Sequence, residues 1–370
     1  MDKVNVGIIG CGDIARKAYV PGVRKFEILN LAACADINES AAQKLGADLN
    51  IPKVCAVDEL LADQAIDLVL NLTVPQAHAP VNLKILEAGK HVYVEKPFAL
   101  CREEAKAVLA KAADKGLLTS GAPDTFLGAG IQTSRKVIDD GWIGEPTAAV
   151  AFFTCPGHER WHPGPEFYYQ QGGGPVLDMG PYYITALVNL LGPVAHVSGM
   201  AKKTYAERTI TSQPKYGKRV PVEVNTHASA TLQFASGAIA TLLMSFDMEQ
   251  AHLPRIEIYG TEGTLEVPDP NCFGGPVRIF RAHQPEPVWS DVPLIHPYFE
   301  NNRGIGAADM AYAVRGIRPH RATGELAAHV LDVMLAVDEA ATQQRTIAIA
   351  STVERPAPLP AGLLMGKLDE

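Results

Sequence analysis

The chain has 370 residues and a formal net charge of −8, with 47% apolar and 20% charged residues. This length suits two domains that each bury a core, and the acidic balance without a basic block excludes the charge pattern of a nucleic-acid-binding protein. No apolar run approaches the ~18 residues that a membrane-spanning helix needs.

The N-terminal residues and the cysteines indicate a protein of a reducing compartment. The opening stretch MDKVNVGIIG enters a strand-like run directly, without the basic, apolar and small-residue succession of a signal peptide. The cysteines lack the paired spacing of a disulfide or zinc framework, so we expect reduced thiols and a cytoplasmic location. They are Cys11, Cys34, Cys55, Cys101, Cys155 and Cys272.

Short apolar strands alternate with helices through the first third of the chain. This alternation is typical of βαβ units and predicts an α/β fold with a parallel sheet. The expected strands are residues 4–10, 31–36, 67–73 and 91–94, and the expected helices are residues 14–26, 39–45, 77–88 and 102–115.

The turn after the first expected strand has the pattern of a dinucleotide-binding loop. Its sequence GIIGCGDIA contains Gly10-x-Gly12-x-x-Ala15. Gly10 permits a tight turn, Gly12 lets the backbone approach a pyrophosphate, and the small Ala15 allows close packing of helix on strand. The helix N-terminus, with Asp13 and Ile14, attracts the phosphate charge. By itself the pattern also fits an ordinary tight turn between packed elements.

An acidic residue strengthens the interpretation of that turn. Asp36 ends the second expected strand, close to the ~20 residues after the turn at which this pattern carries an acid. A carboxylate there accepts both ribose hydroxyls of an adenosine and repels a 2′-phosphate, and no arginine follows closely. We therefore expect NAD as cofactor in preference to NADP.

The strand at 91–94 is followed by Glu95-Lys96-Pro97. Ligands of open α/β sheets gather outside the carboxyl ends of the strands, so this pair is well placed for cofactor and substrate. The Lys96 ammonium can hydrogen-bond a substrate hydroxyl and stabilise developing oxyanion charge. The alternative is an ordinary surface ion pair ahead of a helix.

A loop rich in His, Trp and Tyr, CPGHERWHPGPEFYYQQ, occupies residues 155–171. Mixed aromatic and polar side chains suit the apolar faces and hydroxyl rims of a sugar, and we expect His158 and Trp161 to contact substrate. Alternatively, both residues only order the loop. His158 and His162 have a spacing that suits a metal on a helix, but prolines and the lack of a third ligand argue against one, so no metal is expected.

Immediately after this loop, GGGPVLDMGPYY places Asp178 and Tyr182 four residues apart. That spacing puts both side chains on one face of a helix, where they can address one hydroxyl-bearing ring. We expect the preceding glycines, Gly172 to Gly174, to leave room for substrate and nicotinamide against the backbone. The competing interpretation is a helix whose Asp and Tyr only cap and pack.

Beyond a turn at residues 142–146, strands dominate, and consecutive strands without helices between them predict an antiparallel sheet. Two hairpins are expected, with turns at Ser236-Gly237 and Glu262-Gly263. We expect residues 1–122 to bind the dinucleotide and residues 123–370 to bind substrate and form the oligomer. The expected strands are residues 147–154, 195–202, 227–234, 238–246 and 255–259, and the expected helices are residues 176–191, 304–315 and 324–343.

Taken together, these motifs resemble those of the glucose–fructose oxidoreductase, inositol dehydrogenase and rhizopine-catabolism (Gfo/Idh/MocA) family. The resemblance implies an N-terminal Rossmann domain with a doubly wound parallel sheet and a C-terminal α/β domain with a large, mostly antiparallel open sheet. It implies NAD(P)-dependent chemistry on sugars and cyclitols, in homodimers or homotetramers that pair through that sheet. By the same resemblance, Thr73 and His78 lie beside the cofactor, and the last helix and tail return to the first domain.

The family commonly has D-x-x-x-H where this chain has Asp178 and Tyr182, with the histidine as general acid/base. The tyrosine here is similar to the glucose–fructose oxidoreductase and dimeric dihydrodiol dehydrogenase branches. We expect Tyr182, made more acidic by Lys96, to take the hydroxyl proton during hydride transfer from a secondary carbinol to nicotinamide. Asp178 then orients the substrate. The candidate catalytic residues are Lys96, Asp178 and Tyr182, which with His158 and Trp161 bind substrate; Tyr298 and Arg303 are weaker candidates for closing the pocket.

Three other functions stay open at this point. One is a redox-neutral, NAD-retaining enzyme that acts like a glycosidase, and another is a non-catalytic sugar sensor on the same scaffold. The third is an aldehyde or dihydrodiol oxidoreductase. The expected cofactor-binding residues are Gly10, Gly12, Asp13, Ile14, Ala15, Asp36, Thr73, His78, Glu95 and Lys96.

Overall fold

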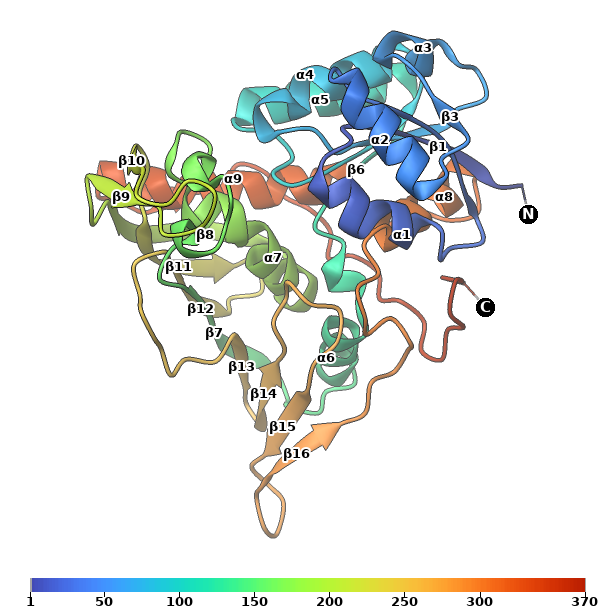
Figure 1. Cartoon of the computed structure of the whole chain (residues 1–370). Coiled ribbons are helices and arrows are strands. Elements are labelled where there is room, and N and C mark those ends of the chain that lie inside the picture. Colours follow the sequence, from blue (N-terminus) through green and yellow to red (C-terminus); the bar gives the residue numbers. More distant parts are fainter. Residues whose placement is uncertain (1, 370) are drawn as a thin grey trace.

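Two β-sheets organise the chain, of which the computed structural model describes residues 2–369 (Figure 1). The first sheet is entirely parallel, with the order β3-β2-β1-β4-β5-β6. The order reverses between β1 and β4, which is where a doubly wound sheet opens its ligand crevice. The predicted α/β class and parallel sheet are confirmed. The strands are β1 (Val4–Ile9), β2 (Leu29–Ala35), β3 (Lys53–Val54), β4 (Leu68–Asn71), β5 (His91–Val94) and β6 (Thr119–Gly121).

Helices connect these strands close to the predicted positions. The helix expected over residues 14–26 is instead a π-helical turn, η1, that continues into a single α-helical turn, α1. The sequence pattern missed β3, α3 and β6; β3 has only two residues and both are exposed, and β6 has only three. The elements are η1 (Ala15–Tyr19), α1 (Val20–Val23), α2 (Glu39–Leu49), α3 (Val57–Ala62), α4 (Pro75–Glu87) and α5 (Arg102–Lys115).

The second sheet has nine strands in the order β16-β15-β14-β13-β7-β12-β11-β8-β17. Only β7 and β12 pair in parallel, so the expectation of a mostly antiparallel sheet is confirmed. The strands are β7 (Pro146–Thr154), β8 (Val194–Lys202), β11 (His227–Phe234), β12 (Ile239–Ser245), β13 (Ile256–Gly260), β14 (Gly263–Val267), β15 (Val277–Arg281), β16 (Trp289–Val292) and β17 (Ile347–Ala348). A separate two-stranded ribbon pairs β9 (Glu207–Thr209) with β10 (Arg219–Pro221).

The two predicted hairpins are present. β11 and β12 pair across the Ser236-Gly237 turn, where Gly237 has φ 93°. The second turn lies one residue earlier than predicted, because β13 ends at Gly260 and β14 already begins at Gly263. Burial alternates along β11 and β12, so one face of the sheet is buried and the other is exposed.

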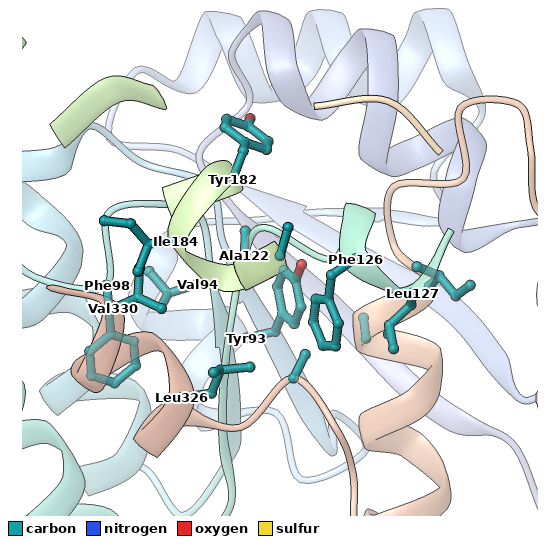
Figure 2. Close-up of a cluster of buried hydrophobic side chains, with 14 of the residues drawn as sticks. Tyr93, Val94, Phe98, Ala122, Phe126, Leu127, Tyr182, Ile184, Leu326 and Val330 are labelled. Carbon is teal, nitrogen blue, oxygen red and sulfur yellow. The ribbon is translucent and has the colours of Figure 1, made fainter. Parts of the chain in front are cut away.

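Helices α7 (Gly174–Leu191) and α9 (Gly324–Gln343) cover the buried face (Figure 1). Helix α9 also contacts α5 and β6 of the first sheet, and it therefore joins the two halves of the molecule. Figure 2 shows the apolar cluster at this junction, with Phe98 near Ile184 of α7 and Val330 of α9, and Tyr93 beside Phe126. None of the helices within residues 2–369 has the length and apolarity to cross a bilayer.

The segment after β16 returns to the first sheet. Helix α8 (Ile305–Val314) packs against α1 and β6, and α6 (Ala129–Asp139) packs against α7. The C-terminal tail is extended, with the Leu359 amide bonded to Gln132 Oε1 at 2.8 Å and the Glu27 amide bonded to the Gly366 carbonyl at 3.3 Å. These contacts fix the tail to both halves.

Candidate active site

The loop after β5 meets α7 through a short ion pair. Lys96 Nζ lies 2.7 Å from Asp178 Oδ1 and donates to the Asp178 carbonyl at 2.8 Å. The two side chains are only 18% and 15% exposed. Lys96 lies two residues after the end of β5, and Asp178 lies in the second turn of α7. The predicted meeting of these two residues, far apart in sequence, is what the structure shows.

Each partner keeps the other charged. Burial raises the pKa of the Asp178 carboxyl, but the Lys96 charge and the hydrogen bonds that Asp178 accepts outweigh burial and lower this pKa to about 2. Burial likewise opposes the charged form of Lys96, and the negative charge of Asp178 holds the pKa of the ammonium above its ordinary value. The cluster therefore contains a fixed carboxylate and a fixed ammonium at neutral pH.

Tyr182 lies one turn after Asp178 on the same helix and beside the same ammonium. Lys96 Nζ stands 5.3 Å from the centre of the Tyr182 ring, within range of a cation–π contact. Figure 2 shows the ring on the side of α7 away from the apolar cluster, with its hydroxyl pointing away from that cluster. Burial raises the pKa of this phenol, while Lys96 and Arg303 oppose the rise.

Arg303 places a second positive charge near the Tyr182 hydroxyl. That charge acts against the rise in the pKa of Tyr182, and Arg303 Nη2 donates to Asn271 Oδ1 at 2.8 Å. The sequence analysis placed Arg303 near the pocket but assigned the acidifying charge to Lys96 alone. Tyr298, the other weak candidate, is fully buried and donates to the Leu364 carbonyl at 2.9 Å, so it holds the tail and does not line the site.

His158 lies on the far side of Asp178. Its Nε2 is 3.2 Å from Asp178 Oδ2, and its Nδ1 accepts from the indole Nε1 of Trp161 at 3.1 Å. The expectation that His158 contacts substrate stays a prediction, and both of its ring nitrogens have protein partners. Trp161 differs, since it is 62% exposed beside the site.

Tyr168 is a further neighbour that sequence analysis left unassigned within the loop. Its ring centre lies 4.2 Å from that of His158. Burial raises the pKa of its phenol, the Asp178 charge adds to this rise, and the Lys96 charge opposes it. Its position in the aromatic loop could have indicated that it lies near the site, but nothing in the sequence distinguished it from Tyr169. Within the described part of the chain, no three His, Cys, Asp or Glu side chains gather as a metal site would require.

Glu95 braces the loop that carries Lys96. Its Oε1 accepts from the Tyr19 hydroxyl at 2.8 Å, and its Oε2 accepts from the Lys96 amide at 2.8 Å. The side chain is buried, so both carboxylate oxygens serve protein groups. Glu95 thus fixes the backbone from which Lys96 reaches Asp178.

The glycine-rich turn after β1 has the shape expected of a phosphate cradle. Gly10 has φ 101°, and a Cβ there would lie 2.5 Å from the Leu72 carbonyl oxygen, so only glycine fits. A Cβ on Gly12 would meet nothing within 4 Å, which leaves open space over the turn. Asp13 and Ile14 are exposed there and Ala15 is buried against the sheet. These residues fit a dinucleotide pyrophosphate at the start of η1.

Asp36 stands beside this turn at the end of β2. Its Oδ2 accepts from the Cys11 amide at 2.7 Å and its Oδ1 from the Asn38 amide at 2.8 Å. A carboxylate has about four lone-pair sites, so two remain for ribose hydroxyls. The charge and the free acceptor capacity both fit an adenosine ribose.

Thr73 and His78 lie next to each other, but they face protein groups. The imidazole of His78 is only 1% exposed, with Nδ1 2.7 Å from the Pro97 carbonyl and Nε2 3.1 Å from the Thr73 carbonyl. The expectation that His78 lies beside the cofactor stays a prediction, and its side chain ties the loop after β4 to the loop after β5. The Thr73 hydroxyl donates to Asn71 Oδ1 at 2.7 Å.

The three glycines before α7 also have a role that differs from the expected one. Gly172 and Gly174 have φ 87° and 86°, which favour glycine. A Cβ on Gly173 would lie 2.5 Å from the Phe167 carbonyl oxygen. Gly173 therefore lets the start of α7 pack directly against the backbone of the aromatic loop, and the space beside Gly172 is taken by the Leu100 side chain.

Comparisons with known proteins agree with this arrangement. The family model described as "Oxidoreductase family, NAD-binding Rossmann fold" matches residues 4–121, and the "GFO/IDH/MocA C-terminal domain" matches residues 131–266. Over 269 residues the chain is 28% identical to the dTDP-3,4-didehydro-2,6-dideoxy-alpha-D-glucose 3-reductase of Streptomyces antibioticus, across 72% of this chain and 75% of that protein. It is 27% identical over 273 residues to the 1,5-anhydro-D-fructose reductase of Ensifer adhaerens, across 70% and 74%.

A solved structure shares the fold across almost the whole chain. Levoglucosan dehydrogenase in complex with NADH superposes with a TM-score of 0.82, covering 95% of this chain and 100% of that one, at 21% identity. At this level of identity the likeness establishes the common fold of both halves.

Proposed function

The chain belongs to the Gfo/Idh/MocA family of NAD(P)-binding oxidoreductases, and from this premise we propose that it is an NAD-dependent dehydrogenase or reductase of sugars. Its substrate carries a secondary hydroxyl, or the corresponding ketone, on a sugar, anhydrosugar or cyclitol ring. The observation that carries this proposal is the cluster of Lys96, Asp178 and Tyr182, in which a fixed ammonium, a fixed carboxylate and a phenol converge.

Each member of the cluster has a task in such a reaction. Bound NAD supplies the hydride acceptor at its nicotinamide. Tyr182 takes the proton of the reacting hydroxyl, and the positive charges of Lys96 and Arg303 stabilise its phenolate. Lys96 also donates to the reacting oxygen, and Asp178 accepts from a neighbouring substrate hydroxyl with its remaining lone pairs. Trp161 offers an exposed ring face for the apolar side of the sugar.

We assign the cofactor to residues 1–122 and the substrate and oligomer contacts to residues 123–370. The open turn at Gly12 suits the pyrophosphate, and Asp36 suits the ribose. NAD is favoured over NADP because the half-buried Asp36 carboxylate would repel a 2′-phosphate. Two copies pair through the exposed face of the second sheet, where Met200 is 80% exposed.

One experiment tests the reaction and the role of Tyr182 together. The purified protein is screened with NAD and with NADP against a panel of sugars, anhydrosugars and cyclitols, following nicotinamide absorbance. We expect NAD reduction with at least one member, and a loss of about 10²- to 10⁴-fold in kcat for Tyr182→Phe, the range for removing a general acid or base. NAD affinity should stay unchanged.

The adjacent residue supplies a matched control. Tyr183 is fully buried and packs edge-on against Phe153, with ring centres 6.2 Å apart. Tyr183→Phe should leave turnover near that of the parent protein. Equal activity of Tyr182→Phe and the parent would remove the proton-transfer role. Ligand binding without any turnover would indicate a sensor, and cofactor retention without net NADH would indicate a redox-neutral enzyme.

A further inference from the structure

Three side chains form a hydrogen-bonded chain from the surface to the centre of the candidate site. The Trp161 indole Nε1 donates to His158 Nδ1 at 3.1 Å, and His158 Nε2 lies 3.2 Å from Asp178 Oδ2. The other oxygen of the same carboxylate holds Lys96 at 2.7 Å. The exposed fraction falls along the chain, from 62% for Trp161 to 7% for His158.

The chemistry of the two outer groups determines where the imidazole carries its proton. An indole nitrogen is a donor only, so His158 Nδ1 must present its lone pair to Trp161. In neutral imidazole the proton then resides on Nε2, which donates to the Asp178 carboxylate. The opposite tautomer would set two N–H groups against each other at one end and two lone pairs at the other.

Aromatic packing and a backbone hydrogen bond also fix the position of the imidazole ring. Its ring centre lies 4.2 Å from that of Tyr168 and 4.5 Å from that of Phe246, so an aromatic ring packs on each of two sides. The His158 amide donates to the Tyr169 hydroxyl at 3.1 Å, and that hydroxyl bonds Glu159. The ring is therefore fixed in position as well as in tautomer.

Glu159 in turn belongs to a buried ion pair. Arg208 Nη1 lies 2.9 Å from Glu159 Oε1 and also donates to the Pro156 carbonyl at 3.2 Å. Both charged side chains are at most 8% exposed, so the loop that carries His158 is anchored on a desolvated, hydrogen-bonded pair.

From these contacts we infer that His158 is a positioning residue whose tautomer is fixed by Trp161 and which aims the Asp178 carboxylate. It carries no proton in the reaction, since neither ring nitrogen is free to reach a substrate. The bond also fixes the Trp161 ring, which becomes a preset wall of the sugar site. This inference rests on the proposed function for its kinetic consequences, but the tautomer itself is a property of the protein without substrate.

Two substitutions at His158 distinguish a role in orienting the Asp178 carboxylate from a role in proton transfer. The amide nitrogen of glutamine lies near the place of Nε2, so His158→Gln keeps a donor to Asp178 and should retain turnover within about threefold of the parent protein. Asparagine places its amide near Nδ1 and leaves Asp178 without that donor. His158→Asn should therefore lose about 10- to 100-fold in kcat, the range for removing a hydrogen bond to a charged group.

A third variant removes only the fixing donor. Trp161→Phe keeps an aromatic wall but lacks the N–H, and it should lower kcat more than it raises KM. Nitrogen-15 NMR of histidine-labelled protein should show His158 in the Nε2–H tautomer, and the Trp161→Phe protein should lose this single tautomer. The spectra need no substrate, so they test the inference even if no member of the panel is turned over.

Definite results would overturn the inference. If His158→Gln is as inactive as Tyr182→Phe, then His158 carries a proton. If the parent protein shows the Nδ1–H tautomer near neutral pH, Trp161 does not fix the ring. Unchanged spectra in Trp161→Phe would lead to the same conclusion.

Discussion

At the scale of single residues, the site depends on how two cations divide their work. Lys96 pairs with Asp178, while Arg303 adds a second positive charge that acts on the Tyr182 phenol. Burial raises the pKa of Tyr182, and these two positive charges act against that rise. A phenol in this setting is protonated at neutral pH in the free protein and accepts a proton only through its smaller phenolate fraction.

The pH dependence of oxidation should therefore report on Arg303. Tyr182 acts as a base only in its phenolate form, so the rate rises with pH toward its pKa. Arg303→Met removes a positive charge that lowers this pKa, which moves the rising limb of kcat/KM to higher pH. At neutral pH we expect a loss of about 10- to 100-fold, because the phenolate fraction falls tenfold for each unit by which its pKa rises.

Arg303→Lys is the matched comparison, because it retains the charge but not the forked geometry. Its rising limb should lie between those of the parent protein and Arg303→Met. A pH–rate profile recorded with saturating cofactor distinguishes the three. Superimposable profiles for the parent protein and Arg303→Met would show that Arg303 does not act on the proton carrier.

At the scale of elements, a close backbone contact places Arg303. Gly22 of α1 packs directly on this segment, and a Cβ there would lie 1.7 Å from the Arg303 carbonyl oxygen. On the other side, Asp124 Oδ2 accepts from the amides of Gly304 at 2.8 Å and Gly306 at 3.0 Å. The first helix of the Rossmann half thus sets the position of a residue from the start of α8.

Gly22→Ala should disturb both stability and turnover. The added methyl group cannot fit without moving α1 or the Arg303 segment, so we expect the free energy of unfolding to fall by about 1–3 kcal/mol, as in overpacked cores. kcat should fall with it, because Arg303 moves away from Tyr182. Urea unfolding and steady-state kinetics measure the two effects.

The exposed Glu27→Ala, a few residues further on, serves as the control and should stay within about 0.5 kcal/mol of the parent protein. A Gly22→Ala protein as stable and active as the parent would mean that the contact is not a constraint in solution.

The local sequence pattern was enough to predict the turn, the strand and the helix that carry the first candidate site residues. The turn at Gly10, the strand before Lys96 and the helix with Asp178 and Tyr182 all follow from glycine placement and apolar period. These features depend on a few neighbouring residues each. The grouping of Lys96 with Asp178 came instead from the resemblance to the family, because Asp178 lies on a helix far from the first sheet in sequence.

The remaining features depend on contacts between distant segments. Arg303 reaches Tyr182 only because Gly22 admits its backbone, and nothing near either residue in sequence indicates that contact. The type of residue at His158 suggested a substrate contact, whereas its hydrogen bonds make it a support for Asp178. The hydrogen bonds of His78 were not predictable for the same reason, since its two carbonyl partners come from two separate loops.

At the scale of the whole molecule, the exposed face of the second sheet is the largest feature that the site does not use. Met200 on β8 is 80% exposed and Ile239 on β12 is 50% exposed. Beside them lies a hollow of about 790 Å³ whose lining includes Ser198, Met200 and Thr241. Apolar side chains on a broad sheet face are typical of a protein–protein interface.

The proposed pairing of two copies through this face gives a final prediction. Met200→Glu places a buried charge in the interface without touching α7, which lies on the other face of the sheet and carries Asp178 and Tyr182. Light scattering should show a dimer or tetramer for the parent protein and a smaller species for Met200→Glu. Turnover per chain should persist, because the residues of the site come from one chain.

Leu364→Glu tests whether any exposed apolar residue would give the same result. Leu364 is 63% exposed but lies on the C-terminal tail, away from the sheet face. Its substitution should leave the assembly intact, since a charge at an exposed position outside the interface meets only water. If both variants keep the mass of the parent protein, or if both lose it equally, the sheet face is not the surface that pairs. A change confined to Met200→Glu follows only if β8 and β12 lie at the contact, because the two substitutions alter net charge and exposed apolar area in the same way.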